Sequence, residues 1–204
     1  MKTRNEFADL LNTSDLVGYG VEVGVRDGQF SQRLLSDWHG WRLWMVDAWT
    51  ANLPHLGDSA GMNDQAKMDK WKAAAEKRAA AFGERARVLQ ALSVDAAGMF
   101  PDGVFDFIYL DSNHGYDPEG EWGIVQDLRA WWPKLRDGGV FAGHDYFLAR
   151  CKRNGTPEFV DSEDEADLEI YGVKKAVDEF ADELGVEVQT TTDDKCASWY
   201  WVKQ

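Results

Sequence analysis

The chain has 204 residues, of which 44% are hydrophobic and 28% charged, and its formal net charge at pH 7 is −14. A chain of this length suffices for one well-buried α/β domain, and the composition excludes a disordered polypeptide. The excess of acidic residues argues against nucleic acid and anionic membranes as partners, because both are bound through clustered lysine and arginine. No apolar run is long enough to span a membrane and no signal-peptide core is evident, so we expect a cytoplasmic protein.

Short apolar runs alternate with stretches of helical periodicity, which is the pattern of βαβ units around a mostly parallel sheet. We predict strands at 20–25, 41–46, 86–91, 105–110, 139–143, 186–190 and 198–202, the last two as an antiparallel hairpin. We predict helices that open at Gly28, cover 63–82, run from Asp117-Pro118 to a stop at Pro133, and span 173–184.

We expect one domain over residues 1–204 with two insertions, at about 50–83 and 146–170. Both leave the sheet at the carboxyl ends of strands, where open α/β sheets bind ligands, so we interpret them as lid or substrate-recognition segments. The second insertion is acidic, with Asp161, Glu163 and Asp164 among its residues. A solvated surface loop is the alternative interpretation of that stretch.

The end of the first predicted strand carries Glu22 and leads into a loop with Gly24 and Gly28. Glycines allow a backbone to approach a ligand where a Cβ would clash, and the following helix supplies amide groups and the positive end of its dipole. The spacing differs from the GxGxxG that seats a dinucleotide pyrophosphate. An acidic residue at the strand end instead suits a cofactor that carries an ammonium as well as a carboxylate.

Asp47 ends the next predicted strand, 25 positions after Glu22. A carboxylate at this place can accept hydrogen bonds from both hydroxyls of a ribose. NAD and S-adenosylmethionine both present a ribose, so Asp47 indicates an adenosyl cofactor without choosing between them. A strand-end turn residue without a ligand is the alternative interpretation.

Four segments share their order and spacing with one known family: residues 22–28 (EVGVRDG), 46–49 (VDAW), 109–116 (YLDSNHGY) and 135–146 (LRDGGVFAGHDY). Together with the Ser-Trp-Tyr strand at 198–200, they resemble class I S-adenosylmethionine-dependent methyltransferases, in particular the group of small-molecule and macrolide-sugar O-methyltransferases. The resemblance implies an α/β fold, with a Rossmann-like doubly wound sheet of seven mostly parallel strands and an antiparallel last strand. It places the cofactor over the ends of the first, second and fourth strands.

The resemblance also assigns cofactor contacts along this edge of the sheet. Gly24 and Gly28, which follow Glu22, pass the methionine portion, Asp47 binds the ribose, and Leu92 and Ser93 contact the adenine. Glu22, Ala48, Trp49 and Asp111 complete the cofactor contacts. Relatives often carry an acidic residue immediately before the position of Ser93, and Leu92 departs from that pattern.

Two acid–histidine pairs end the fourth and fifth predicted strands: Asp111 with His114, and His144 with Asp145. These strands are neighbours in the implied fold, so the pairs would meet in one cleft. Asp111 and Asp145 could supply oxygen ligands to Mg²⁺ or another divalent cation. The resemblance implies that His114 is the general base, with Asp111 beside it in the catalytic pair. His144 is unusual next to magnesium, because imidazole suits softer metals: it turns away, the metal is softer, or no metal binds.

These assignments predict O-methylation of a hydroxyl group on a small molecule or glycan. The sequence does not decide whether the protein forms a homo-oligomer. An NAD-dependent oxidoreductase would share Asp47, but it lacks support from the glycine spacing and does not explain the terminal hairpin. A metal hydrolase could use the Asp/His cluster, but it would leave Glu22, Gly24 and Asp47 without a role. A cofactor-binding module without turnover is the third alternative.

Overall fold

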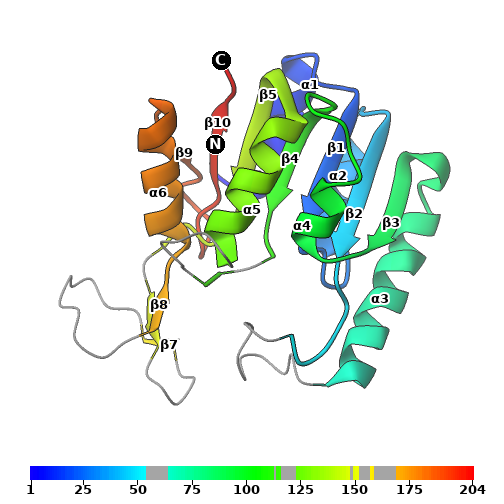
Figure 1. The fold of residues 1–204 in the computed structure, drawn as a ribbon. Helices are drawn as coiled ribbons and strands as arrows, with labels where there is room; N and C mark the ends of the chain where they lie inside the picture. Colours follow the sequence, from blue (N-terminus) through cyan, green and yellow to red (C-terminus); the bar gives the residue numbers. More distant parts are fainter. Residues whose placement is uncertain (54–63, 113, 116–122, 148, 152–156, 159–168) are drawn as a thin grey trace.

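Figure 1 shows a twisted sheet with helices on both of its faces. The computed structural model describes residues 1–53, 64–112, 114–115, 123–147, 149–151, 157–158 and 169–204. The strands of the main sheet are β1 (Tyr19–Val23), β2 (Arg42–Asp47), β3 (Ala86–Gln90), β4 (Phe105–Leu110), β5 (Leu135–Gly143), β9 (Gln189–Thr190) and β10 (Trp199–Val202).

The spatial order of these seven strands is β3-β2-β1-β4-β5-β10-β9. Strands β1 to β5 pair in parallel, whereas β10 runs antiparallel to both β5 and β9. This confirms the predicted fold class, a doubly wound, mostly parallel sheet whose last strand is reversed. The strand order changes direction between β1 and β4, and a ligand crevice is expected at their carboxyl ends.

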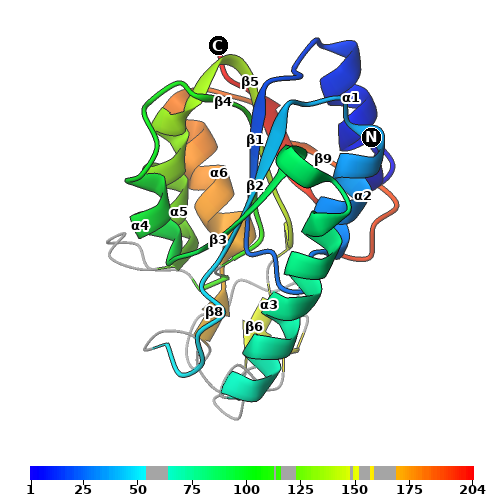
Figure 2. The same cartoon turned by 90° about the vertical axis from the view of Figure 1, so that its right-hand side faces the viewer.

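Helices form one layer on each face of the sheet (Figures 1 and 2). One layer holds α1 (Phe7–Thr13), α2 (Gln29–Asp37) and α3 (Gln65–Ala80), and the other holds α4 (Ser93–Ala97), α5 (Gly123–Trp131) and α6 (Val173–Leu184). Short 3₁₀ turns are η1 (Arg4–Glu6), η3 (Gly83–Arg85) and η4 (Trp132–Lys134). None of the described helices has the length and apolar character needed to cross a membrane.

The central strand β4 is buried along its whole length, as its continuous apolar sequence predicts for a strand covered on both faces. Its side chains reach both helix layers. Phe107 and Tyr109 pack against Phe7 of α1. Phe105 packs against Trp131 of α5, on the opposite face from Phe107, and the pairing with β5 shifts register between these two residues. The two aromatic cores hold β1 and β4 in register up to their last residues, so the loops that follow these strands lie side by side.

The predicted elements agree with the structure in kind and differ mainly at their ends. The helix predicted over 63–82 is α3, whose N-cap Asp64 accepts a hydrogen bond from the Lys67 N–H. β5 begins at Leu135, earlier than the predicted start at 139, and β9 is shorter than the predicted strand. The start predicted at Asp117-Pro118 lies outside the described residues, while α5 ends at Trp131, two residues before the predicted stop at Pro133.

The first predicted insertion contributes α3, which buries Met68, Ala75 and Ala79 in the core. The described part of the second insertion contains β6 (Ala149–Cys151), β7 (Pro157–Glu158) and β8 (Glu169–Tyr171), which form a separate antiparallel sheet. The acidic residues at 161–165 lie outside the described residues. The division into one domain with two lid segments stays a prediction.

Candidate active site

A cavity of about 740 Å³ is lined by residues that end or follow β1 to β5, together with residues of η1, α3, α4 and α5. Its volume lies in the range of small-molecule sites, and it lies where the strand order changes direction. Most of the predicted site residues line it: Gly24, Asp47, Ala48, Trp49, Leu92, Ser93, Asp111, His114, His144 and Asp145. Glu22 and Gly28 were predicted with them and lie outside this lining.

Gly24 and Gly28 have left-handed backbone conformations, with φ of +93° and +84°. A Cβ on Gly24 would lie 2.1 Å from the carbonyl oxygen of Asp111, and one on Gly28 would lie 3.1 Å from the Cα of Ala75 in α3. Close packing within the chain therefore requires both glycines, whatever ligand binds. This differs from the sequence interpretation, in which the ligand needs the space: the glycines first allow the walls of the cleft to form.

The Asp47 carboxylate is held by two backbone amides. Its Oδ2 accepts from the Arg26 N–H at 2.7 Å and its Oδ1 from the Trp49 N–H at 2.9 Å. Burial raises the pKa of Asp47, and these amide donors oppose the rise. Each oxygen keeps a further lone pair, so the group can also accept from two ligand hydroxyls. The Trp49 ring is 1% exposed and donates its Nε1–H to the Arg26 carbonyl oxygen at 2.7 Å.

The α4 side of the cleft contains a carboxylate that the sequence analysis missed. Leu92 is exposed here, and the Ser93 hydroxyl accepts a hydrogen bond from Trp131 Nε1 at 2.9 Å. Asp127 of α5 lines the same side, and its Oδ2 accepts from the Ser112 hydroxyl at 2.5 Å. Burial raises the pKa of Asp127 to about 6, against the opposing effect of that hydrogen bond. Its signal in the sequence was an acid four positions before Trp131, on the apolar face of a predicted helix.

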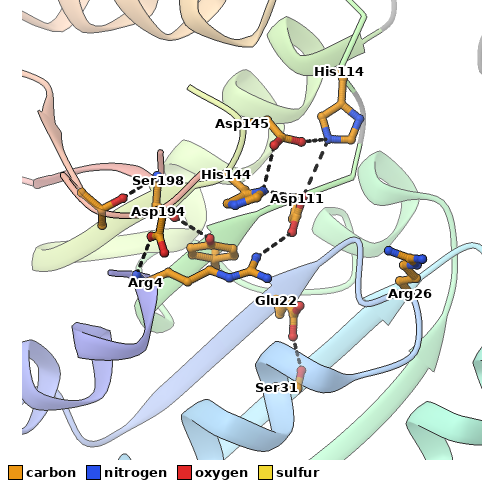
Figure 3. Close-up of polar contacts among 12 residues, drawn as sticks. Arg4, Glu22, Arg26, Ser31, Asp111, His114, His144, Asp145, Asp194 and Ser198 are labelled. Carbon is orange, nitrogen blue, oxygen red and sulfur yellow. Dashed lines mark hydrogen bonds and ion pairs between the residues drawn. The ribbon is translucent and has the colours of Figure 1, made fainter. Parts of the chain in front are cut away.

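The two acid–histidine pairs meet in one cluster, as the neighbouring strands require (Figure 3). Asp145 lies between the histidines: its Oδ2 is 2.9 Å from His114 Nε2, and its Oδ1 is 3.0 Å from His144 Nδ1. Both nitrogens lie 3.7 Å from Oδ1 of Asp111. Asp145 has a left-handed backbone with φ of 55°, a conformation that is rare outside glycine and clusters at functional sites.

The cluster changes the acidity of its members. Burial lowers the pKa of His114, but hydrogen bonds and charges from Asp111 and Asp145 outweigh it and raise that pKa to about 9. Burial acts upward on the pKa of Asp145, and the two histidines outweigh it, so this pKa lies well below the usual range of an aspartate. When no metal ion is bound to Asp111 and Asp145, His114 is therefore positively charged at neutral pH.

The ligand atoms of Asp111, His114 and Asp145 lie within 4.8 Å of one another, a spacing that fits one metal ion. No other group of three such side chains occurs among the residues that the structure describes. This set contains His114 where the sequence analysis named His144. The two carboxylates suit Mg²⁺ or Mn²⁺, and an imidazole ligand moves the preference toward Mn²⁺, Fe²⁺ or Zn²⁺.

Arg4 also lines the cleft, although the sequence analysis did not single it out. Its Nη1 lies 3.4 Å from Oδ2 of Asp111. The two oxygens of Asp111 therefore face different partners, one the arginine and the other the two histidines. Arg4 belongs to η1, far from Asp111 in sequence, so only the tertiary structure reveals this contact.

Glu22 lies behind the cleft lining, is 2% exposed and accepts a hydrogen bond from the Ser31 hydroxyl of α2. Burial raises the pKa of Glu22 to about 8; Ser31 and Arg4 oppose the rise, and the carboxylates of Asp111 and Asp47 add to it. At neutral pH and above, ionising this group works against folding.

We expect Glu22→Gln to stabilise the protein at pH 8.5 by about 1–3 kcal/mol, with the gain disappearing as the pH falls toward 4.5. The pKa of Glu22 is higher in the folded state than its ordinary 4.5, so the folded state binds the proton more tightly. Its ionisation therefore costs stability as the pH rises from about 4.5 to about 8. Glutamine keeps an acceptor for Ser31 and carries no charge. Urea unfolding at both pH values measures the difference.

Asp106→Asn is the matched control for that experiment. Asp106 is also a buried carboxylate, but it accepts from the Arg136 Nε–H and the Gly18 N–H, both at 2.5 Å. Its replacement should lower stability at both pH values, because charge-assisted hydrogen bonds are lost. A Glu22→Gln protein that is no more stable than the unaltered chain at pH 8.5 would contradict the cost assigned to Glu22.

Most of the residues that form the cleft lie within a segment that matches a known family. A family model described as a methyltransferase domain matches residues 21–146, which is more than half of the chain. No curated protein matches the sequence.

Solved structures share the fold at low sequence identity. The O-methyltransferase from Bacillus cereus in complex with S-adenosylhomocysteine is 16% identical, with a TM-score of 0.58 over 98% of this chain and 80% of that one. The O-methyltransferase TomG from Streptomyces achromogenes, in complex with S-adenosylmethionine, is 14% identical, with a TM-score of 0.58 over 98% and 80%. The Burkholderia thailandensis 1,6-didemethyltoxoflavin-N1-methyltransferase, with its named substrate and S-adenosylhomocysteine bound, is 15% identical, with a TM-score of 0.58 over 98% and 77%.

Proposed function

This chain belongs to the methyltransferase family whose model it matches, and on that premise we propose that it transfers a methyl group from S-adenosylmethionine to a hydroxyl of a small-molecule acceptor. One observation carries the proposal. A single cleft joins Asp47, a carboxylate suited to a ribose, to an acid–histidine cluster that contains His114. The glycine spacing after Glu22 disfavours an NAD-dependent oxidoreductase, and a hydrolase would leave Asp47 without a role.

The donor is proposed to lie across the ends of β1, β2 and β4. In this arrangement the methionine portion lies at the turn formed by Gly24, with Glu22 and Gly28 supporting that turn from behind. Asp47 accepts from the ribose hydroxyls, flanked by the backbone of Ala48 and Trp49. The adenine lies on the α4 side at Leu92 and Ser93, where Asp127 supplies the carboxylate that position 92 lacks.

The reaction is an in-line displacement at the sulfonium methyl group. The acceptor oxygen forms the new bond to the methyl carbon while the carbon–sulfur bond breaks, and its electron pair returns to sulfur to give the neutral thioether. The hydroxyl proton passes to the His114 imidazole, whose Nε2 lies 2.9 Å from Asp145 and 3.7 Å from Asp111. Holding oxygen, methyl and sulfur in line supplies much of the rate, and proton removal adds to it.

A divalent cation would be held by Asp111 and Asp145, with His144 as the third ligand where His114 serves as the base; His114, whose ligand atom has a suitable spacing, would otherwise take that place. Such an ion, when bound, lowers the pKa of an acceptor hydroxyl and orients it. Where His144 is not a ligand, it orients Asp145 through the 3.0 Å contact between Nδ1 and Oδ1.

The proposed acceptor is a polyhydroxylated sugar, with a phenolic compound as the second choice. The acidic charge of the chain, −14 at pH 7, disfavours strongly anionic acceptors. Solved structures with this fold include enzymes named for O-methylation and one named for N-methylation, so the fold alone does not select the acceptor atom. The proposal of a hydroxyl oxygen rests on His114, a base that can remove the hydroxyl proton.

Calorimetry with S-adenosylhomocysteine and with NAD tests the donor, and a radiolabelled methyl donor offered with sugars and phenols tests the reaction. We expect S-adenosylhomocysteine to bind in the micromolar range, NAD not to bind, and label to appear in a hydroxylated acceptor. Binding of NAD alone would favour the oxidoreductase. Bond hydrolysis without any methyl donor would favour the hydrolase. Tight S-adenosylhomocysteine binding without transfer to any acceptor would favour a binding module.

A further inference from the structure

The charges that line the cleft are unevenly divided. Five aspartates line it, whereas its basic side chains are Arg4, Arg26, His144 and His114, the last of which is paired with Asp145. The aspartates are Asp47, Asp95, Asp111, Asp127 and Asp145. Such a surface attracts the sulfonium and ammonium groups of S-adenosylmethionine but repels the carboxylate of its amino-acid end. That carboxylate needs a cation inside an acidic cleft.

Arg4 is held in place by contacts from several parts of the chain. Its backbone N–H donates to Asp194 Oδ2 at 2.7 Å, and the Asp193 N–H donates to the Lys2 carbonyl oxygen at 2.8 Å. The guanidinium lies over the Phe30 ring, 5.2 Å from its centroid. The segment before α1 is thus tied to the loop between β9 and β10 through Arg4 and Asp194 (Figure 3).

Arg4 and Asp111 together present one positive and one negative group to the cleft. Nη1 lies 3.4 Å from Oδ2, and the two side chains remain 32% and 21% exposed. An α-amino acid carries an ammonium and a carboxylate in just such an adjacent arrangement. Resting on the proposed function, we infer that Arg4 binds the α-carboxylate of the methyl donor while Asp111 accepts from its α-ammonium group.

Arg26 is less suited to this task because of its position. Its guanidinium lies over the Trp71 ring of α3, 4.9 Å from the centroid, and its backbone N–H already binds Asp47. Figure 3 shows Arg26 apart from the cluster, whereas Arg4 reaches between Glu22 and Asp111. Arg26 therefore lies on the ribose side, and Arg4 lies at the β1–β4 junction. An arginine at that junction can bind a carboxylate through two parallel hydrogen bonds.

The test compares two ligands that differ by one group: S-adenosylhomocysteine and its decarboxylated analogue, which keeps the adenosine, the thioether and the amine. Calorimetry on the full chain should show that the unaltered protein prefers S-adenosylhomocysteine by roughly 10- to 100-fold, the size of a charge-assisted contact. In Arg4→Gln this preference should fall to about threefold or less, while affinity for the analogue changes little. Arg4→Lys should restore part of the preference, because it restores the charge without the planar fork.

Arg26→Gln is the matched control and should keep the preference for the carboxylated ligand. If Arg4→Gln weakens both ligands equally, or weakens neither, Arg4 is not the carboxylate-binding residue and the inference is overturned. Thermal unfolding of each variant shows whether the segment before α1 has come loose, and binding of the decarboxylated analogue shows that the rest of the cleft is intact. If the unaltered protein binds neither ligand, the proposed donor itself is wrong and this inference falls with it.

Discussion

Replacing His114 with alanine is expected to lower kcat for methyl transfer by roughly 10²- to 10⁴-fold, the range for removal of a general base. Affinity for S-adenosylhomocysteine should change by less than about threefold, because an interaction made only in the transition state leaves donor binding intact. His114 contacts Asp145 at 2.9 Å, whereas the proposed donor contacts at Asp47 are made by a different loop. Steady-state kinetics and calorimetry on the same preparation measure both quantities.

Two further histidine variants make this result specific. His39 is exposed and lies between α2 and β2, so His39→Ala should keep the turnover of the unaltered protein. His144→Ala removes the group that orients Asp145 and should cost less than His114→Ala. An equal or larger loss in His144→Ala would move the role of base to His144. Near-normal turnover in His114→Ala would remove that residue from the mechanism.

The pH dependence of kcat gives a separate readout on the same residue. The neutral imidazole is the form that accepts a proton, and the flanking carboxylates raise the pKa of His114 to about 9. In protein freed of divalent metal, kcat should therefore rise with pH up to about 9. Mg²⁺ held by Asp111 and Asp145 would weaken their stabilisation of the imidazolium, and the rise should move to lower pH. An unchanged profile on adding Mg²⁺ would contradict metal binding between these carboxylates.

The sheet and its helices were predictable because local and global signals agree along most of the chain. The apolar run at 105–110 predicts a strand buried on both faces, and β4 has those bounds. The start of β5 was harder to place, because Asp137, Gly138 and Gly139 are typical of a turn before a strand, whereas the pairing with β4 begins at Leu135 through an irregular register. Of the strand predicted over 186–190, only two residues are paired, as β9.

The residues of the candidate site were predictable where the order of the strands alone determines their position. Parallel strands bring their carboxyl ends to one edge, so strand-end residues such as Asp47, Asp111 and Asp145 had to meet once the strands were known. Arg4 and Asp127 could not be found in that way. One reaches the cleft from a turn far away in sequence, and the other from the buried face of α5. Their placement depends on helix packing and on a contact between the two ends of the described chain, which no local spacing encodes.

Gly24→Ala is expected to destabilise the protein by roughly 4 kcal/mol or more and to abolish measurable binding of S-adenosylhomocysteine. Two costs combine at this position: a backbone with φ of +93° and a Cβ that would lie 2.1 Å from the Asp111 carbonyl oxygen. The nearest atoms belong to backbone, which cannot turn away as a flexible side chain would. Relief requires the loop after β1 to separate from the loop after β4. Urea unfolding and calorimetry measure the two effects.

Gly103→Ala separates these two costs, because Gly103 has φ of +66° and nothing within 4 Å of its added Cβ. This variant should lose about 1 kcal/mol, the cost of the left-handed conformation alone, and should keep ligand binding. The excess loss in Gly24→Ala then measures the contact with Asp111. Because one oxygen of Asp111 faces Arg4 and the other faces the histidines, displacing its backbone disturbs both ends of the cleft at once. If the two variants lose equal stability, the loops after β1 and β4 separate at little cost. Gly24 would then be required for its backbone conformation alone, and not for its close contact with Asp111.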